Sequence, residues 1–399
     1  MQPFKRISPR LLSQTRAFAT ERSTATGLTD RKWKLEWSPR TGPAPSPPTG
    51  FTREYVETAD GRLELLTTTS KASIGTDKPP LFFQHGGFGC ADVYIPWMEY
   101  FSKRGYPCYA LSIRGHGYSW GPSYYKMVFG TTAPMLAHDV AAGVRYVTDL
   151  HKTDSVRRRG GGLPVLLGHS NGGGLSQMLL DRGYAQASAL VILAGTPNFG
   201  GWGVYKNWGT FDPWFLPRMY FRDLFHPRSP LSKTSLVHRA FFCDEFPRKE
   251  VQEFENSMSP YLSYWWPIQI MGRFVKTENV LSNLTGWGGG RVFVLAAERD
   301  RLMSLKLMGR MAEEYRQQRA YMVRSGVFTG DSKATDQGWV SGESGRTKFG
   351  GFEGIRDGIA YRVVEGAGHH LQNDLQRNIG AAYLEQWLEI IGREDHTTR

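Results

Sequence analysis

The fold of this chain is decided by residues 163–178, with the sequence LPVLLGHSNGGGLSQM. The apolar run from Leu163 to Leu167 predicts a short buried strand, and the apolar residues from Leu175 onward recur at helical spacing. The residues GHSNG at 168–172 lie between them and match the G-x-S-x-G pattern of a sharp strand-to-helix turn with a serine at its apex. Small residues are needed on both sides of that serine because strand and helix approach each other closely there.

Ser170 is expected to adopt a strained conformation that pushes its hydroxyl out above the sheet. The backbone amide of Asn171 opens the helix, so it can donate a hydrogen bond to a developing oxyanion. A five-residue match of this kind also occurs in glycine-rich loops and in small-anion sites. The rest of the chain therefore has to decide between these interpretations.

The composition is that of a large chain with a basic surface. Its 399 residues are 40% hydrophobic and carry a net charge of +12, which suits one large α/β domain or a domain with a lid. No stretch of about 18 uncharged apolar residues occurs, so no membrane span is expected. Without zinc-ligand spacing or an RNA-binding motif, we interpret the positive charge as a solvated face and expect no nucleic-acid partner.

The N-terminus and the cysteines indicate a compartment. Residues 1–18 carry four bases and no acid, which is typical of a mitochondrial transit peptide, and cleavage is expected near Phe18 and Ala19. A disordered basic tail is the alternative. The odd number and wide spacing of the cysteines argue against a disulfide framework and for a reducing compartment, so we expect a soluble protein of the mitochondrial matrix. The cysteines are Cys90, Cys108 and Cys243.

Residues 19–50 are expected to form a proline-rich linker or arm, and the folded core begins at Phe51. Residues 52–58 and 63–69 flank an Asp60-Gly61 turn and predict the two strands of a β-hairpin. Strands that alternate with helical patterns after it predict a mostly parallel sheet with helices on both faces. These strands are expected at residues 81–84, 109–113, 163–167 and 189–194.

Three motifs in this order resemble the α/β-hydrolase superfamily. They are His85-Gly86-Gly87, Arg114-Gly115-His116-Gly117 and the serine pentapeptide at 168–172. Two later strands complete the pattern, because the strand at 291–297 is followed by Asp300 and the strand at 361–365 by a glycine-flanked His369. The chain order serine, acid, histidine is that of the superfamily. The resemblance covers residues 51–197 and 288–395 and implies an α/β-hydrolase fold.

The resemblance assigns three catalytic roles. Ser170 would be the nucleophile, His369 the base that activates its hydroxyl, and Asp300 the acid that orients the imidazole. A serine at this position implies an acyl-enzyme. The alternatives are His370 for the base and Glu298 or Asp374 for the acid.

The resemblance also implies an oxyanion hole formed by the backbone amides of Gly87 and Asn171, with Phe88 as the alternative to Gly87. No cofactor is expected, because the chain has no Walker loop or dinucleotide fingerprint. The other histidines of these motifs are interpreted as structural, and no metal site is expected because they lack the spacing of a ligand set. These histidines are His85, His116 and His169.

Two insertions interrupt the core, which is expected at residues 51–197 and 288–399. Residues 198–287 are rich in aromatic side chains and are expected to form a lid, which the family often has at this place. Residues 325–358 are expected to form a flexible surface loop. An aromatic lid indicates an apolar substrate pocket, although many of its aromatic residues are expected to pack within the lid. The candidate pocket residues are Phe88, His169, Trp202, Trp265 and Trp266.

Together, these features predict a serine hydrolase of the esterase or lipase type that cleaves a carboxylic ester or thioester of an apolar acyl or aromatic small-molecule substrate. An acyltransferase or a C–C bond hydrolase on the same triad is the alternative among enzymes, because the lid would select the acceptor. A binding module on an inactive hydrolase fold is a third interpretation, which the three filled triad positions disfavour. The fold implies only the scaffold, and the site has to carry the chemistry.

Overall fold

The computed structural model describes residues 30–32, 35–68, 77–152, 162–328 and 358–394. The predicted transit peptide at 1–18 lies outside these residues, as does most of the predicted loop at 325–358. In the described parts of the chain, no helix combines the length and the apolar character needed to cross a membrane.

The centre of the structure is an eight-stranded sheet with the order β1-β2-β4-β3-β5-β6-β7-β8. The hairpin predicted around Asp60 is present, because β1 and β2 pair antiparallel from Phe51 opposite Thr68 to Val56 opposite Leu63. β2 also pairs antiparallel with β4, and every later pairing is parallel. The strands are β1 (Phe51–Val56), β2 (Leu63–Thr68), β3 (Leu81–Gln84), β4 (Cys108–Leu111), β5 (Val165–His169), β6 (Ala189–Leu193), β7 (Val292–Ala297) and β8 (Ile359–Val364).

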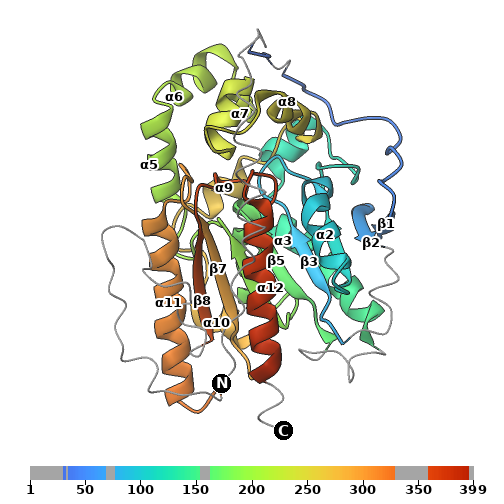
Figure 1. The fold of residues 1–399 in the computed structure, drawn as a ribbon. Helices are drawn as coiled ribbons and strands as arrows, with labels where there is room; N and C mark the ends of the chain where they lie inside the picture. The colour runs from blue at the N-terminus through green and yellow to red at the C-terminus, as the bar shows by residue number, and fades with distance from the viewer. Residues whose placement is uncertain (1–29, 33–34, 69–76, 153–161, 329–357, 395–399) are drawn as a thin grey trace.

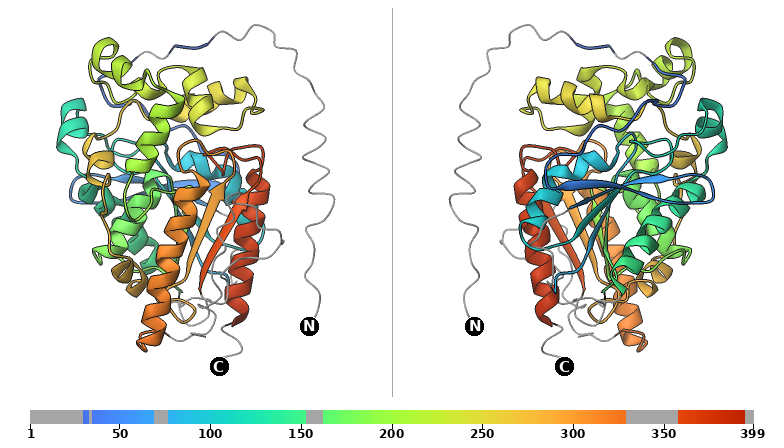
Figure 2. Two further views of the ribbon diagram at one scale, coloured as in Figure 1. Left: turned by 90° about the vertical axis from the view of Figure 1, so that its left-hand side faces the viewer. Right: turned by 90° about the vertical axis from the view of Figure 1, so that its right-hand side faces the viewer.

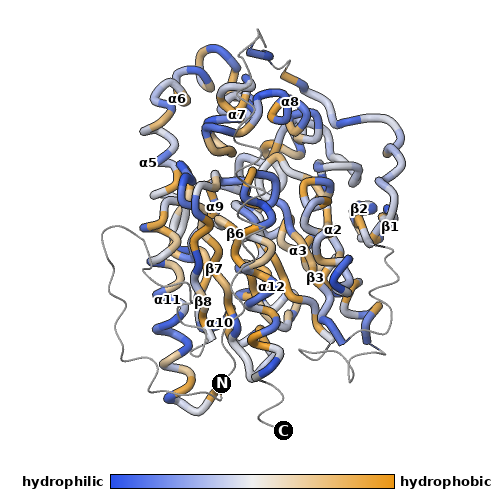
Figure 3. Tube along the Cα trace, in the orientation of Figure 1, coloured by the Kyte–Doolittle hydropathy of each residue, from blue (hydrophilic) through white to orange (hydrophobic). Residues whose placement is uncertain are grey.

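The parallel strands are mostly apolar because helices cover both faces of the sheet. Every residue of β3, β5, β6 and β7 is buried, and in Figure 3 these strands form the hydrophobic centre. Helices α2 and α12 contact each other on one face, while α3, α4, α10 and α11 contact one another in series. The helices are α2 (Ile95–Ser102), α3 (Ala133–Leu150), α4 (Asn171–Asp181), α10 (Thr277–Ser282), α11 (Leu305–Arg324) and α12 (Arg377–Glu394).

A run of short helices is inserted between β6 and β7, and we call residues 198–287 the cap. In Figure 1 and in both views of Figure 2, the helices α5 to α8 lie above the carboxyl ends of the parallel strands. The cap helices are α5 (Trp202–Phe211), α6 (Phe215–Pro217), η6 (Arg218–Arg222), η7 (Ser229–Leu231), α7 (Thr234–Phe241), α8 (Arg248–Ser257) and α9 (Trp265–Gln269), followed by α10. Two short helices of the core, η2 (Ala91–Tyr94) and η3 (Lys126–Gly130), complete this end of the molecule.

The described part of the N-terminal arm contacts the cap (Figure 1). The Asp30 carboxylate accepts hydrogen bonds from the backbone and the hydroxyl of Ser235 at 2.9 and 2.8 Å. Further along the arm, the Trp37 ring packs against His226 with 4.8 Å between centroids, and the backbone oxygen of Glu36 lies 2.8 Å from Nε2 of His226. The arm is therefore anchored by specific contacts at its described residues.

Candidate active site

Ser170 occupies a strained turn between β5 and α4. Its φ of 52° and ψ of −130° are unusual for a residue with a side chain. The flanking glycines are required sterically, because a Cβ on Gly172 would lie 2.1 Å from the backbone oxygen of His85, and one on Gly168 would lie 2.6 Å from Cα of Gly173. The turn therefore holds the serine at the carboxyl edge of the sheet, as the sequence predicted.

Three side chains that are far apart in sequence form a hydrogen-bonded chain. Nε2 of His369 lies 2.9 Å from Oγ of Ser170, and Nδ1 of His369 lies 2.7 Å from Oδ2 of Asp300. The second carboxylate oxygen, Oδ1 of Asp300, accepts hydrogen bonds from the amides of Leu302 and Met303 at 2.7 and 2.9 Å. The His369 and Asp300 side chains are fully buried, so the imidazole and the carboxylate are held in a fixed orientation.

The sheet explains how these residues meet. The strands β5, β6, β7 and β8 are neighbours and run parallel, so the segments that follow them gather at one edge. Asp300 follows β7 and His369 follows β8, and the two segments are joined by a hydrogen bond from the Arg299 amide to the Ala367 oxygen at 2.9 Å. Adjacent parallel strands thus place the acid beside the histidine.

The alternative residues from the sequence lie in other contacts. Oε2 of Glu298 accepts a hydrogen bond from the Gly366 amide at 2.8 Å, so it braces the turn after β8. The His370 amide donates to the backbone oxygen of Phe241 at 2.8 Å, and its Nδ1 lies 3.0 Å from Nδ2 of Asn373. Among the candidates, the structure joins Asp300 and His369 to the serine hydroxyl.

Asp374 has a structural role that the sequence did not reveal. This fully buried carboxylate accepts hydrogen bonds at Oδ2 from the amides of Gly368 at 2.7 Å and Cys243 at 2.9 Å. The Cys243 thiol donates to Oδ1 at 3.0 Å, and burial together with this carboxylate raises the pKa of the thiol, which keeps it protonated. Asp374 therefore ties the histidine loop to the cap. Asp374 and Cys243 are 131 positions apart in the sequence, and no local pattern signals such a contact.

The turn after β3 lies directly against the serine. A Cβ on Gly86 would lie 2.7 Å from Cβ of Ser170, and one on Gly87 would lie 3.8 Å from the side-chain nitrogen of Asn171. Phe88 has a positive φ of 63°, and its backbone oxygen accepts a hydrogen bond from the cap residue Ser259 at 2.8 Å. The turn that carries the proposed donors Gly87 and Phe88 therefore adjoins the start of α4, which carries the Asn171 amide.

The remaining histidines of the site are buried. Nε2 of His169 lies 3.0 Å from the His369 backbone oxygen, and since that oxygen can only accept, Nε2 carries the proton. Burial lowers the pKa of His169 and His85, and it lowers the pKa of His116 to about 4. These imidazoles are therefore neutral at pH 7. No group of three potential metal-binding side chains occurs within the described residues.

The structure places the predicted pocket residues in different surroundings. Trp266 is fully buried and lies edge-on to His116 at 6.0 Å, and Phe88 is also buried. Trp265 is 42% exposed and donates from Nε1 to the Phe129 backbone oxygen at 2.6 Å, whereas Trp202 is 70% exposed at the start of α5. A role of these residues in lining the substrate pocket stays a prediction.

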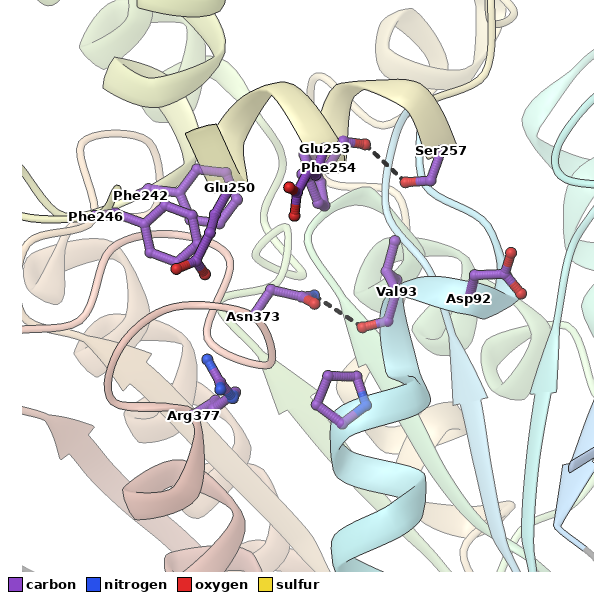
Figure 4. Close-up of a pocket in the computed structure, with 11 residues that line it drawn as sticks. Asp92, Val93, Phe242, Phe246, Glu250, Glu253, Phe254, Ser257, Asn373 and Arg377 are labelled. Atoms are coloured by element: carbon purple, nitrogen blue, oxygen red, sulfur yellow. Dashed lines mark hydrogen bonds between the residues drawn. The ribbon is translucent and has the colours of Figure 1, made fainter. Parts of the chain in front are cut away.

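A pocket of about 310 Å³ opens beside the histidine loop, between α8, the start of α2 and the segment before α12. Phe254 of this pocket packs against His370 with 4.7 Å between ring centroids. Nδ2 of Asn373 donates to the Val93 backbone oxygen at 2.8 Å, as Figure 4 shows. Its lining includes Asp92, Glu250, Glu253 and Arg377 but none of the three residues of the hydrogen-bonded chain.

An eight-stranded, mostly parallel sheet with serine, acid and histidine at its carboxyl edge defines the α/β-hydrolase architecture. The family model described as "alpha/beta hydrolase fold" matches residues 79–326, and the chain belongs to this family. The fold class and the resemblance inferred from the sequence are confirmed.

Solved structures with low sequence identity share the fold. An esterase from Exiguobacterium antarcticum is 15% identical, with 84% of this chain and 98% of that chain covered and a TM-score of 0.53. An enol-lactonase from Burkholderia xenovorans LB400 is 12% identical, with 84% and 100% covered and a TM-score of 0.52. A membrane phospholipase A described as a bacterial virulence factor is 15% identical, with 86% and 87% covered and a TM-score of 0.52.

Proposed function

We propose that this protein is a serine hydrolase that cleaves carboxylic esters or thioesters through an acyl-enzyme on Ser170. The observation that carries the proposal is the chain of short distances from Asp300 through His369 to the serine hydroxyl, 2.7 and 2.9 Å. A serine hydroxyl is a weak nucleophile at neutral pH, and an oriented imidazole within hydrogen-bond distance is the group that activates it.

The mechanism follows from this geometry. The Ser170 hydroxyl transfers its proton to Nε2 of His369 while Oγ attacks the carbonyl carbon, and Asp300 stabilises the imidazolium. The amides of Gly87 and Asn171 donate to the oxyanion, each such donor contributing about 3 kcal/mol. His369 then protonates the leaving alcohol or thiol as the acyl-enzyme forms. A water molecule, deprotonated by His369, hydrolyses the acyl-enzyme and restores the serine.

An apolar acyl or aromatic substrate is proposed because apolar side chains of the cap face the reaction centre. Leu262 of the cap approaches the oxyanion turn, since a Cβ on Gly87 would lie 3.3 Å from its Cδ2. The Phe241 ring lies 5.8 Å from the His369 ring. Transfer of the acyl group to another acceptor, or hydrolysis of a C–C bond, would use the same three residues. Product analysis with and without an added alcohol distinguishes acyl transfer from hydrolysis.

Labelling of the full-length protein with a fluorophosphonate, followed by peptide mapping, tests the proposal. We expect an adduct on Ser170 that is lost in His369→Ala, because a fluorophosphonate reacts with serines activated by a base. No adduct on a folded protein would contradict the proposal and would favour the inactive binding module. Hydrolysis of p-nitrophenyl esters of increasing chain length then defines the acyl preference.

We also propose that the protein acts in the mitochondrial matrix. The support is the sequence of residues 1–18, with four bases and no acid. Fusion of this segment to a fluorescent protein is expected to direct it to mitochondria, while a variant with the four bases replaced by glutamine is expected to remain in the cytosol. Equal distribution of both fusions would contradict the proposal.

A further inference from the structure

One end of the cap exposes large apolar side chains to solvent. Phe221 is 86% exposed, Trp214 71% and Leu224 70%, and Phe225 and Tyr220 are also exposed. Exposed apolar residues are ordinary when they are scattered singly, but a contiguous group of them marks an interaction surface. All five belong to the twelve residues from 214 to 225: Trp214 directly precedes α6, Tyr220 and Phe221 lie on η6, and Leu224 and Phe225 lie in the turn that follows.

This surface continues onto the core through direct contacts. The Tyr220 and Phe225 rings pack edge-on with 4.8 Å between centroids. The Tyr264 hydroxyl donates to the Phe225 backbone oxygen, and its ring lies 5.7 Å from the exposed ring of Phe129. The segments involved lie at the same end of the cap in the left-hand view of Figure 2. We call Phe129, Trp214, Tyr220, Phe221, Leu224 and Phe225 the docking patch.

The exposed charges of segment 202–233 and of η3 are basic, whereas Glu36 of the arm, whose backbone oxygen contacts His226, is an exposed acid. The segment 202–233 contains two acids, Asp212 and Asp223, and both are buried in ion pairs with Arg218 and Arg222. In contrast, Lys206 of this segment is exposed. Lys126, in the same short helix as Phe129, is exposed as well. The surface therefore combines aromatic side chains with net positive charge and complements an anionic partner.

The backbone at the centre of the docking patch is strained. Leu224 and Phe225 have positive φ values of 46° and 60°, a region where glycine or asparagine is favoured over large apolar residues. Strain of this kind persists only where the surrounding structure holds it, and it clusters at functional sites. Here, it accompanies the exposure of Leu224 and Phe225.

We propose that the docking patch binds the surface of a lipid bilayer that contains anionic lipids. Aromatic rings with a polar edge suit the boundary between headgroups and acyl chains, and exposed lysines add attraction to anionic headgroups. A protein partner would require a surface of complementary shape, whereas a fluid bilayer adapts to exposed apolar side chains such as those of Phe221 and Leu224. We therefore assign the surface to a membrane and not to a second copy of this chain.

The docking patch is connected to the site by a short segment of the cap, which suggests the substrate class. Leu262 approaches Gly87 of the oxyanion turn, and two residues later Tyr264 contacts the docking patch. Only residues 262–264 of the cap therefore separate the docking patch from the turn beside Ser170. An ester that leaves the bilayer at the patch would enter the site along this segment. This second part, hydrolysis of a membrane-borne lipid ester, rests on the function proposed above, whereas membrane binding does not.

Sedimentation of the full-length protein with vesicles tests the binding. We use an equal mixture of phosphatidylcholine and phosphatidylglycerol, and phosphatidylcholine alone as the neutral case. The double variant Phe221→Ser with Leu224→Asn is expected to lower the partition constant at least about tenfold, because it removes two side chains that enter the headgroup boundary. Asn at position 224 suits the positive φ, which protects the fold. Lys126→Glu is expected to weaken binding to the anionic vesicles but not to the neutral ones.

Tyr321→Ser is the matched control, because Tyr321 is a similarly exposed ring on α11, outside the docking patch. It is expected to bind vesicles like the unmodified protein. Failure of the unmodified protein to bind either vesicle, or equal binding by the double variant, would overturn the proposal. Concentration-dependent dimerisation that the double variant abolishes, without vesicle binding, would assign the patch to a second copy and overturn it as well.

Activity separates the two proposals. The double variant is expected to hydrolyse a water-soluble short-chain ester at the unmodified rate, but a vesicle-borne ester at least about tenfold more slowly. Equal rates on the vesicle-borne ester would contradict delivery of substrate through the docking patch. Vesicle binding without hydrolysis of any ester would contradict the proposed function and leave membrane binding intact.

Discussion

The His369 imidazole lies 2.9 Å from the Ser170 hydroxyl although 199 positions separate the two residues. The contact is made rigid on both sides. The serine is held by a turn in which its backbone oxygen accepts hydrogen bonds from the amides of Gly173 and Thr196 at 2.9 and 3.0 Å. The imidazole is held by Asp300, so proton transfer between the two groups needs little rearrangement.

Replacement of the serine is the direct test of nucleophilic catalysis. Ser170→Ala is expected to lower kcat for ester hydrolysis at least about a thousandfold, because it removes the attacking oxygen. The melting temperature is expected to change little, since the hydroxyl is not needed to cap α4. Initial rates and thermal unfolding of both proteins check this. Retained turnover by Ser170→Ala would contradict the assignment.

The acid is tested by a substitution that keeps its shape. In Asp300→Asn, the amide oxygen can still accept from Leu302 and Met303, but the NH2 group then faces Nδ1 of His369. Nε2 would carry the proton and could not accept another from Ser170. We expect kcat to fall about 10³- to 10⁴-fold.

Glu298→Gln is the matched control for this prediction. Glu298 follows the same strand but accepts a hydrogen bond from Gly366 instead of contacting the imidazole. It is expected to lower kcat less than about tenfold, because it lies outside the hydrogen-bonded chain. A larger loss of kcat in Glu298→Gln than in Asp300→Asn would show that Glu298, and not Asp300, is the acid that orients the imidazole.

Asp374 is expected to support both stability and activity. In Asp374→Asn, an NH2 group would replace either Oδ2, which accepts from the amides of Gly368 and Cys243, or Oδ1, which accepts from the Cys243 thiol and the Leu375 amide. Either mismatch costs about 1–3 kcal/mol in the free energy of unfolding. Because Gly368 precedes His369, kcat is also expected to fall, with a smaller change in KM. Chemical denaturation and steady-state kinetics measure the two effects. Cys243→Ser keeps a hydroxyl donor and is expected to lower the free energy of unfolding less than Asp374→Asn does. An unchanged free energy of unfolding for Asp374→Asn would contradict the structural role of this carboxylate.

Because several histidines are buried and neutral, the protein is expected to lose stability in mild acid. Burial lowers the pKa of His116 from 6.5 to about 4, so the unfolded chain binds the proton more readily than the folded one. The neutral His116 therefore contributes up to about 3 kcal/mol to the free energy of unfolding. This contribution is complete above pH 6.5 and is lost as the pH falls from 6.5 toward 4. His85, His169 and His370 shift in the same direction.

Melting temperatures between pH 7.5 and 5 measure this effect. In His116→Asn, the side-chain amide can replace the Nδ1 donor to the Arg114 oxygen but does not titrate. The variant is expected to lose less stability between pH 6.5 and 5 than the unmodified protein. Parallel curves for the two proteins would show that His116 does not contribute.

The sequence by itself determined the features that depend on neighbouring residues. The apolar run before Gly168 and the small residues around Ser170 specify a strand, a sharp turn and a helix because periodicity and steric exclusion act locally. The alternation of strands and helices then implied the parallel sheet, and the order of the motifs implied the family. The hairpin around Asp60 followed from turn chemistry in the same way.

Only the tertiary structure decided which distant groups meet. His369 and His370 are neighbouring residues of the same type, yet only His369 contacts Ser170. Trp265 and Trp266 are also identical neighbours, yet Trp265 is exposed and Trp266 is buried. The contact of Asp374 with the cap and the assembly of the docking patch likewise join segments that are far apart in sequence. The physical reason is that side-chain direction and packing between separate elements depend on the whole fold, whereas local patterns specify only the elements themselves.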